Sequence, residues 1–86
     1  MTHAWPDGLP IQVETLDEQG APRAFGWRGR NWTVERVVQR WMIDTDWWSE
    51  RGRLRRFYVA VITREGLLCA LFHDPEGGWR ITRVYD

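Results

Sequence analysis

Three runs of alternating apolar residues, separated by short glycine-containing turns, fill the last third of this 86-residue chain. The runs and their turns, in order, are LRRFYVAVIT (54–63), Glu65-Gly66, LLCALFH (67–73), DPEGG (74–78) and WRITRVY (79–85). Alternation with a period of two is typical of β-strands, and short connections of this kind join antiparallel neighbours. The spacing therefore predicts a three-stranded antiparallel sheet at this end of the chain.

Both faces of this predicted sheet are apolar. A tight turn at Glu65-Gly66 and a four-residue second loop place one set of residues on a core face: Phe57, Val59, Val61, Ala70, Phe72, Trp79 and Ile81. The opposite face then carries Tyr58, Ala60, Ile62, Cys69, Leu71, Arg80 and Thr82. Because neither face can be left fully in water, both must be at least partly covered. The expected fold is all-β, a small curled antiparallel sheet or partly open barrel of five to six strands.

The beginning of the chain is expected to contribute less. Residues 1–9 hold Pro6 and Gly8 in a polar setting and predict a flexible lead-in to a single small β domain over residues 10–86. Within that domain, PIQVETL (10–16) alternates and predicts a half-buried strand.

The next segments predict a hairpin and a longer element. RAFGWRGRNWTV (23–34) predicts a hairpin with Gly29-Arg30 at its turn and Trp27 paired with Trp32. Residues 33–44 fit two interpretations, because their apolar residues fall at helical spacing but the stretch continues a strand and is rich in β-branched residues. A strand with a bulge near Val37-Val38 is favoured, and a single helix around 34–42 is the alternative. TDWWSERGR (45–53) predicts a loop.

Charge and cysteine content exclude some classes of protein. Net charge is zero, and all 12 basic residues are arginine. A neutral total disfavours a strong non-specific nucleic-acid binder, although residues 28–64 hold nine arginines and four acids, a local excess of +5 that permits local anion binding. The single cysteine excludes an internal disulfide. With neither a signal peptide nor a long apolar run, the sequence predicts a cytoplasmic protein.

The sequence offers no catalytic, cofactor or metal site, and we expect no enzyme. Cys69 lies mid-strand and is expected to be a buried small hydrophobe. His3 and His73 are far apart, and no Cys or His at ligand spacing accompanies them. Asp44, Asp46 and Glu50 fit loop carboxylates paired with nearby arginines better than an acid–base pair.

One cluster of residues suggests binding. Tryptophans and arginines gather around the entry to the strand at 54–63, and the candidate contact residues are Trp47, Trp48, Arg53, Arg55, Arg56 and Tyr58. Such residues are enriched at protein-interface hot spots, and they also bind single-stranded nucleic acid by stacking and phosphate contact. A structural domain with no ligand site, in which these residues form only the rim of the sheet, is the third interpretation. The second apolar face also allows a homodimer.

Four segments carry a resemblance: WRGR (27–30), DWW (46–48), RRFYVAVITREG (55–66) and LCALFHDPEGGWRITRVYD (68–86). Over roughly residues 23–86 the chain resembles a small bacterial domain family of unknown function. The same pattern is similar to the carboxy-terminal segment of ImuB-type proteins, catalytically degenerate relatives of Y-family polymerases. The resemblance implies an accessory role in DNA repair or damage tolerance, by protein contacts or at DNA. It implies no polymerase activity, since the chain has no polymerase domain.

Overall fold

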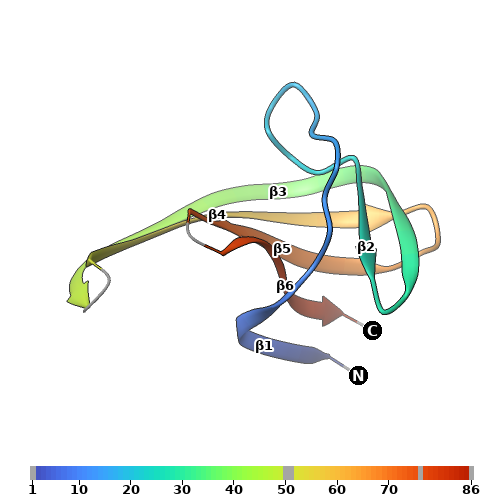
Figure 1. The fold of residues 1–86 in the computed structure, drawn as a ribbon. Helices are drawn as coiled ribbons and strands as arrows, with labels where there is room; N and C mark the ends of the chain where they lie inside the picture. The colour runs from blue at the N-terminus through green and yellow to red at the C-terminus, as the bar shows by residue number, and fades with distance from the viewer. Residues whose placement is uncertain (1, 50–51, 76, 86) are drawn as a thin grey trace.

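Six antiparallel strands form one strongly curled sheet, a half-barrel (Figure 1). The computed structural model describes residues 2–49, 52–75 and 77–85, and in residues 44–49 and 52–54 it describes only the backbone. The strands are β1 (His3–Pro10), β2 (Ala24–Trp27), β3 (Arg30–Ser49), β4 (Gly52–Thr63), β5 (Leu68–Asp74) and β6 (Gly78–Tyr85). Their order in the sheet is β1-β6-β5-β4-β3-β2. The predicted all-β architecture is confirmed.

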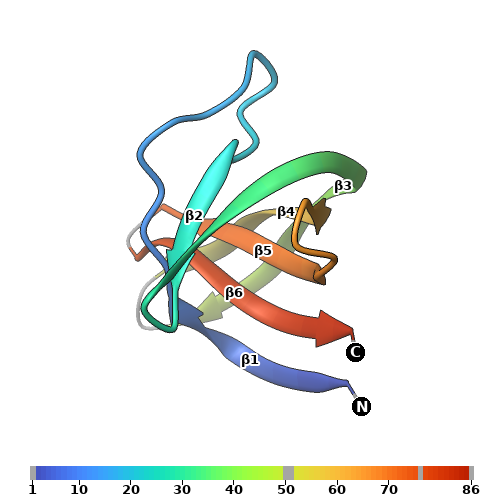
Figure 2. The same cartoon turned by 90° about the vertical axis from the view of Figure 1, so that its right-hand side faces the viewer.

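Bulges in β3 give the sheet its curl. The pairing of β3 with β4 shifts register between Val34 and Arg36 and again between Val37 and Gln39. A bulge adds a residue to one strand and so bends it and increases its twist. The first part of β3 therefore turns with β2 across the sheet, as Figure 2 shows. The predicted bulge near Val38 is confirmed, and the helical alternative for residues 34–42 is wrong.

The hairpin between β3 and β4 is longer than expected. Residues 45–49 and 52–53 were predicted to be a loop, but they continue the two strands, and Trp48 pairs with Arg53 in the backbone register. Figure 1 shows this end of the hairpin reaching beyond the rest of the sheet. The sequence TDWWSERGR (45–53) has no regular alternation of apolar and polar residues, because a two-stranded ribbon outside the core needs no apolar face.

The core lies on the concave face, where β2 covers the middle strands. Its centre consists of pairs that are opposite one another on β4, β5 and β6, with Phe25 and Trp27 of β2 packed against them. The buried members are Ala21, Phe25, Trp27, Val59, Val61, Cys69, Leu71, Ile81 and Val84. Burying an aromatic or branched side chain contributes about 1.5–3 kcal/mol, so β2 is a major source of stability although it is four residues long.

A short segment after β1 closes one end of the half-barrel. The Ile11 amide donates to the Trp79 carbonyl of β6 at 3.2 Å, and Gln12 exchanges two main-chain hydrogen bonds with Gly26 of β2. Residues 10–16 were predicted to be a strand, but they form only isolated bridges at Gln12 and Leu16. The alternation in this segment reflects side chains that pack on the core from a closing loop, with Ile11 and Val13 against it.

The expected flexible lead-in is instead an edge strand. Residues 3–10 form β1, which pairs with β6 on both sides of a large bulge between Ala4 and Leu9. The bulge carries Pro6, Asp7 and Gly8 over the convex face, where Arg80 Nε donates to the Asp7 carbonyl at 2.9 Å. Proline and glycine, which suggested a loose segment, serve here to shape this bulge.

The two C-terminal turns each differ from prediction by one residue. The Thr63 amide donates to the Leu67 carbonyl at 2.9 Å, and Asp74 pairs with Gly78, so each loop contains three residues. A one-residue change of register moves a whole strand's side chains to the other face. Thus Cys69 and Leu71, rather than Ala70 and Phe72, face the concave core. The two errors cancel in β6, whose Trp79 and Ile81 lie on the predicted face.

The convex face is also covered. A row of side chains opposite one another on adjacent strands, here called the aromatic row, consists of Trp41, Tyr58 and Phe72. Tyr58 stacks on Trp41 with ring centroids 5.2 Å apart, and its ring lies 5.2 Å from that of Phe72. Phe72 has no exposed surface, because the β1 bulge lies over it at Gly8. The expectation that both faces need cover is met by this bulge.

Cys69 allows a test of this packing. Its side chain is fully buried in the core, as predicted, and burial raises the pKa of the thiol to about 12. We expect a disulfide reagent such as DTNB at pH 8 to modify Cys69 roughly a thousandfold more slowly in the native protein than in denaturant, since reaction requires unfolding. Equal rates in the two states would show that this part of the core is open.

None of the described segments is a helix of the length and hydropathy needed to cross a membrane.

Candidate functional site

The structure brings two of the predicted contact residues together, Arg56 and Tyr58. Both belong to β4 and lie on the convex face beside Phe72. The Arg56 guanidinium lies over the Phe72 ring at 4.5 Å, and its Nη1 is 3.5 Å from both the Tyr58 hydroxyl and the Pro6 carbonyl. Arg56 Nε is buried without a hydrogen-bond partner. Arg56 therefore lies at the edge of the aromatic row and also covers part of it.

Of the other four predicted contact residues, the structure describes the side chain of Arg55 alone. Arg55 is exposed, and alternation along β4 turns it to the opposite face from Arg56. The side chains of Trp47, Trp48 and Arg53 lie outside the described part of the structure. Their backbones belong to the outer part of the β3–β4 hairpin. The Tyr58 ring is flanked by Trp41 and Phe72.

A second group of tryptophans and arginines, not predicted as a site, lies where β1 meets the β2–β3 hairpin. We call it the hairpin cluster, and it consists of Trp5, Trp27, Arg28, Arg30 and Trp32. The Arg28 guanidinium lies 4.4 Å from the ring centre of Trp27 and 5.8 Å from that of Trp5. Arg30 lies 4.7 Å from the ring centre of Trp32. Each arginine is thus held against an indole face, an arrangement that guanidinium groups favour.

The tryptophans of this cluster also support one another. Trp5 and Trp27 meet edge to face at 5.9 Å, and the Trp27 and Trp32 rings lie 6.3 Å apart. Trp32 Nε1 donates to the Trp27 carbonyl at 3.2 Å. Trp27 is 8 % exposed, whereas Trp5 and Trp32 are partly open. The cluster therefore joins the core on one side and presents indole and guanidinium groups to solvent on the other.

The turn of the hairpin places Arg28 in an uncommon conformation. Trp27 pairs with Arg30, so the two turn residues are Arg28 and Gly29, with φ values of 53° and 72°. Two positive φ values are typical of a type I′ turn, for which asparagine and glycine are the favoured residues. The predicted Gly29-Arg30 turn is wrong by one residue, because an arginine in the left-handed region is rare enough to be disregarded from sequence. The contacts of the Arg28 guanidinium with the Trp27 and Trp5 indoles offset part of the strain of this left-handed backbone conformation.

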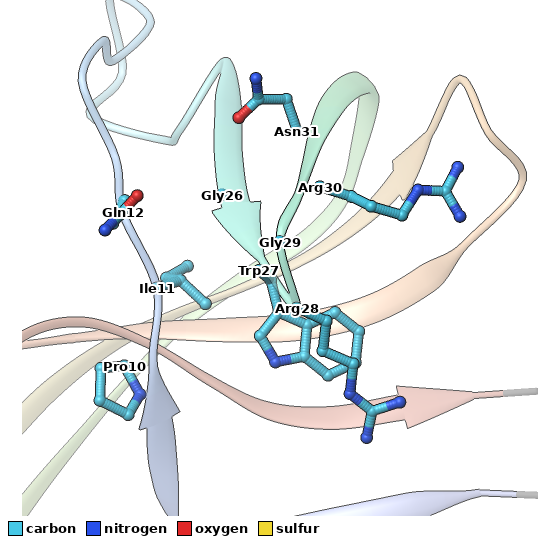
Figure 3. Close-up of a pocket in the computed structure, with 9 residues that line it drawn as sticks. All are labelled: Pro10, Ile11, Gln12, Gly26, Trp27, Arg28, Gly29, Arg30 and Asn31. Carbon is cyan, nitrogen blue, oxygen red and sulfur yellow. The ribbon is translucent and has the colours of Figure 1, made fainter.

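A cavity of about 470 Å³ opens beside this turn, between residues 10–12 and the hairpin. Figure 3 shows that the Arg28 side chain extends past Trp27 while Arg30 points away in another direction, so the two guanidinium groups do not converge on the cavity. The side-chain amides of Gln12 and Asn31 lie nearby on either side of Gly26. The described residues that line this cavity include no His, Cys, Asp or Glu, so they offer no acid, base or thiol for a reaction.

The charges of the hairpin cluster are open to a partner. Arg28 and Arg30 are exposed, and among the residues that the structure describes neither has a carboxylate at ion-pair distance. In the same part of the chain no three His, Cys, Asp or Glu side chains gather where they could hold a metal ion. The arrangement suits non-covalent recognition by planar cations and rings.

Sequence reasoning missed this cluster for two reasons. The sequence predicts only a hairpin turn at WRGRNW (27–32), and the cluster also requires Trp5, which lies in the segment expected to be a lead-in. The signal that could have found part of it is the spacing of Arg30 and Trp32, since side chains two apart in a strand share a face.

Comparison with known proteins gives one result. A family model described as "Domain of unknown function (DUF6504)" matches residues 10–86. No curated protein and no solved structure matches.

Proposed function

Since this chain belongs to the DUF6504 family, whose function is undefined, we propose from its own surfaces that it is a non-catalytic binding module. We propose further that it serves as an accessory protein in bacterial DNA repair or damage tolerance, in the cytoplasm, and that it acts through contacts with a protein partner. The hairpin cluster is the proposed docking surface. The observation that carries the proposal is the pair of exposed arginines held on indole faces without a carboxylate partner among the described residues.

Physical reasoning supports a protein partner at this surface. Tryptophan and arginine are the residues most enriched at interface hot spots, where a few side chains supply most of the binding free energy. Arg28 and Arg30 are already ordered by stacking, so less side-chain entropy is lost when a partner binds. A rigid four-residue β2 and a two-residue turn hold both groups in fixed positions.

The repair context is supported by the resemblance of the chain to the carboxy-terminal segment of ImuB-type proteins. The shared segments run from WRGR (27–30) to the closing strand at 79–85. The first of these segments contains both arginines of the hairpin cluster, which is why we place the partner contact there. A partner from a bacterial mutagenesis or repair complex is the expected one.

The test is to replace Arg28 by asparagine and Arg30 by glutamine. Asparagine favours the left-handed conformation of a type I′ turn, so Arg28→Asn should change the free energy of unfolding by about 1 kcal/mol or less while it removes the guanidinium. Loss of a hot-spot residue costs at least about 2 kcal/mol of binding, roughly a 30-fold rise in Kd. We expect affinity capture with the double variant to lose a repair protein that the wild-type chain captures.

The matched control is Arg83→Gln, since Arg83 is also exposed and lies 5.8 Å from the Tyr85 ring, on β6. It should retain every partner. Captured protein sets that are the same for the wild type and for the Arg28→Asn, Arg30→Gln variant would remove the hairpin cluster as a docking surface, and a partner unconnected with DNA repair would remove the proposed context.

A further inference from the structure

A second cleft, of about 460 Å³, lies along β3 beyond the end of β2. Arginines from three separate segments line it, and we call it the arginine cleft: Arg23 precedes β2, Arg36 and Arg40 belong to β3, and Arg64 lies in the turn between β4 and β5. All four are exposed. In a chain whose net charge is zero, the fold has gathered a third of the 12 basic residues around one hollow.

The carboxylates of the cleft do not balance this charge. Two of them line it, Asp17 and Glu35, which leaves an excess of +2 among the lining residues. Asp17 lies 3.8 Å from Arg40. Within the described part of the chain, Arg23, Arg36 and Arg64 have no carboxylate at ion-pair distance. Guanidinium groups held together in this way favour an anion from outside the chain.

Asp17 is a fixed part of the cleft wall. Its Oδ1 accepts hydrogen bonds from the main-chain amides of Ala21 and Gln19, at 2.9 and 2.8 Å. The Ala21 bond is the main cause that lowers the pKa of Asp17, with smaller contributions from Gln19 and from the positive charges of Arg40 and Arg23. The carboxylate is therefore ionised and stationary at neutral pH, and it competes with any anion that enters.

The main chain around the cleft has little left to offer a ligand. Val34 donates to the Arg23 carbonyl, Arg64 donates to the Thr33 carbonyl, and Arg23 donates to the Thr15 carbonyl. From Glu35 onward, β3 pairs with β4 alone among the described strands. Along the cleft, the register shifts at 34–36 and 37–39 interrupt the regular spacing that an added peptide strand needs. Recognition at this cleft must therefore depend on the guanidinium groups.

The placement of the arginines requires an extended ligand. Arg36 is opposite Ile62 and Arg40 is opposite Val59, and these two β4 residues face opposite sides of the sheet. Four residues of regular strand also span roughly 13 Å, and the bulges shorten this only in part. A single small anion therefore cannot contact the guanidinium groups of both Arg36 and Arg40. No aromatic ring lines the cleft among its described residues, so bases are not stacked there.

We propose that the arginine cleft binds the sugar–phosphate backbone of a single-stranded nucleic acid, independently of its base sequence. This inference goes beyond the proposed protein contact and uses a different surface. The neutral chain supplies no general attraction, so binding is confined to this cleft and falls steeply with salt. An acidic peptide carries similar charge, but the interrupted edge of β3 gives it no main-chain pairing.

The first test is fluorescence anisotropy with a labelled oligothymidylate of about 12 nucleotides. With three unpaired arginines contacting phosphates, binding to the wild type should weaken roughly 20-fold between 50 and 200 mM salt. In the Arg36→Gln, Arg64→Gln variant one such contact remains, so the loss over the same range should be about two- to threefold, from a much weaker start. Arg83→Gln, on β6, should match the wild type. Absence of binding by the wild type at 50 mM salt would overturn the proposal, and so would an affinity of the Arg83→Gln protein as low as that of the Arg36→Gln, Arg64→Gln variant.

The second test predicts a gain of binding, which misfolding cannot imitate. Asp17→Asn keeps the oxygen that accepts from Gln19 and Ala21 but removes the competing charge, and it should bind the oligonucleotide about fivefold more tightly at low salt. Glu18→Gln removes an exposed neighbouring charge that does not line the cleft and should have a smaller effect. Equal effects of the two substitutions would contradict the assignment of the site.

Two further measurements separate this proposal from its rivals. A polyglutamate chain of equal charge should displace the oligonucleotide poorly; displacement as strong as by unlabelled oligonucleotide would mean that the cleft is a site for acidic peptides. The Arg28→Asn, Arg30→Gln variant should bind the oligonucleotide as the wild type does. If this variant loses oligonucleotide binding, the strand lies on the hairpin cluster and the cleft proposal is wrong, whatever the outcome of the partner capture.

Discussion

Replacing Gly8 by alanine should lower the free energy of unfolding by about 3 kcal/mol or more, because two costs add. Gly8 has a φ of 73°, which an alanine adopts only with strain of about 1–2 kcal/mol. A Cβ at this position would also lie 2.7 Å from Phe72 Cε1 and 2.8 Å from Arg80 Cβ. Neither neighbour is the free end of a flexible chain, and such overpacking costs about 1–3 kcal/mol. Chemical denaturation followed by tryptophan fluorescence measures the loss.

Gly29→Ala is the matched control. Gly29 has nearly the same φ, 72°, but a Cβ there would meet nothing within 4 Å. Its cost should therefore be the backbone strain alone, about 1–2 kcal/mol. If the two alanine variants lose equal stability, the β1 bulge does not press on Phe72 and the convex face is less well packed than described.

The Phe72→Ala variant should lose about 3–5 kcal/mol of stability, the range typical of a fully buried aromatic residue. Phe72 is buried between the Tyr58 ring and the Arg56 guanidinium of β4 and the Gly8 backbone of β1, so the cavity left by alanine has walls from two elements. Tyr85→Ala serves as a control. Because Tyr85 is 37 % exposed, its replacement should lower the free energy of unfolding far less. A loss below about 1 kcal/mol for Phe72→Ala would mean that the convex face is not a second core.

A double-mutant cycle connects these two residues. In the Phe72→Ala background, Gly8→Ala no longer meets the phenyl ring, so its cost should fall toward that of Gly29→Ala. The expected coupling is about 1–2 kcal/mol, within the range for residues in contact. Simple additivity of the two losses would show that Gly8 is constrained by its φ alone.

Sequence patterns predict the strands of this protein better than they predict its faces. Alternation located β4, β5 and β6, and the mixed character of residues 34–42 suggested the bulge in β3. The face of the sheet on which each side chain lies was harder to predict, because it depends on the number of residues in each turn. The turns at 64–66 and 75–77 each contain three residues, and a difference of one residue exchanged the positions of Leu71 and Phe72.

The candidate surfaces show a similar limit. Arg56 and Tyr58 could be placed together because both belong to one strand. The hairpin cluster could not be predicted in this way, because Trp5 and Arg28 are 23 residues apart in the sequence. Trp5 lies at the β1 bulge, and the Pro6 and Gly8 of this bulge made the segment resemble a flexible lead-in. The arginine cleft depends on Arg23 and Arg64, whose main chains both bond to β3, and no local sequence pattern indicates that they lie near one another.

The closing contacts of the half-barrel have a consequence for the order of folding. The strands β3 to β6 pair with neighbours in the chain and can form a meander from nearby segments, whereas Arg80 reaches the Asp7 carbonyl across 73 residues. Closing so long a loop carries a large entropic penalty until the meander exists to receive β1. The amino-terminal strand is thus the last part to dock and the first to detach, and transient release of β1 would uncover Phe72 while most of the sheet stays intact.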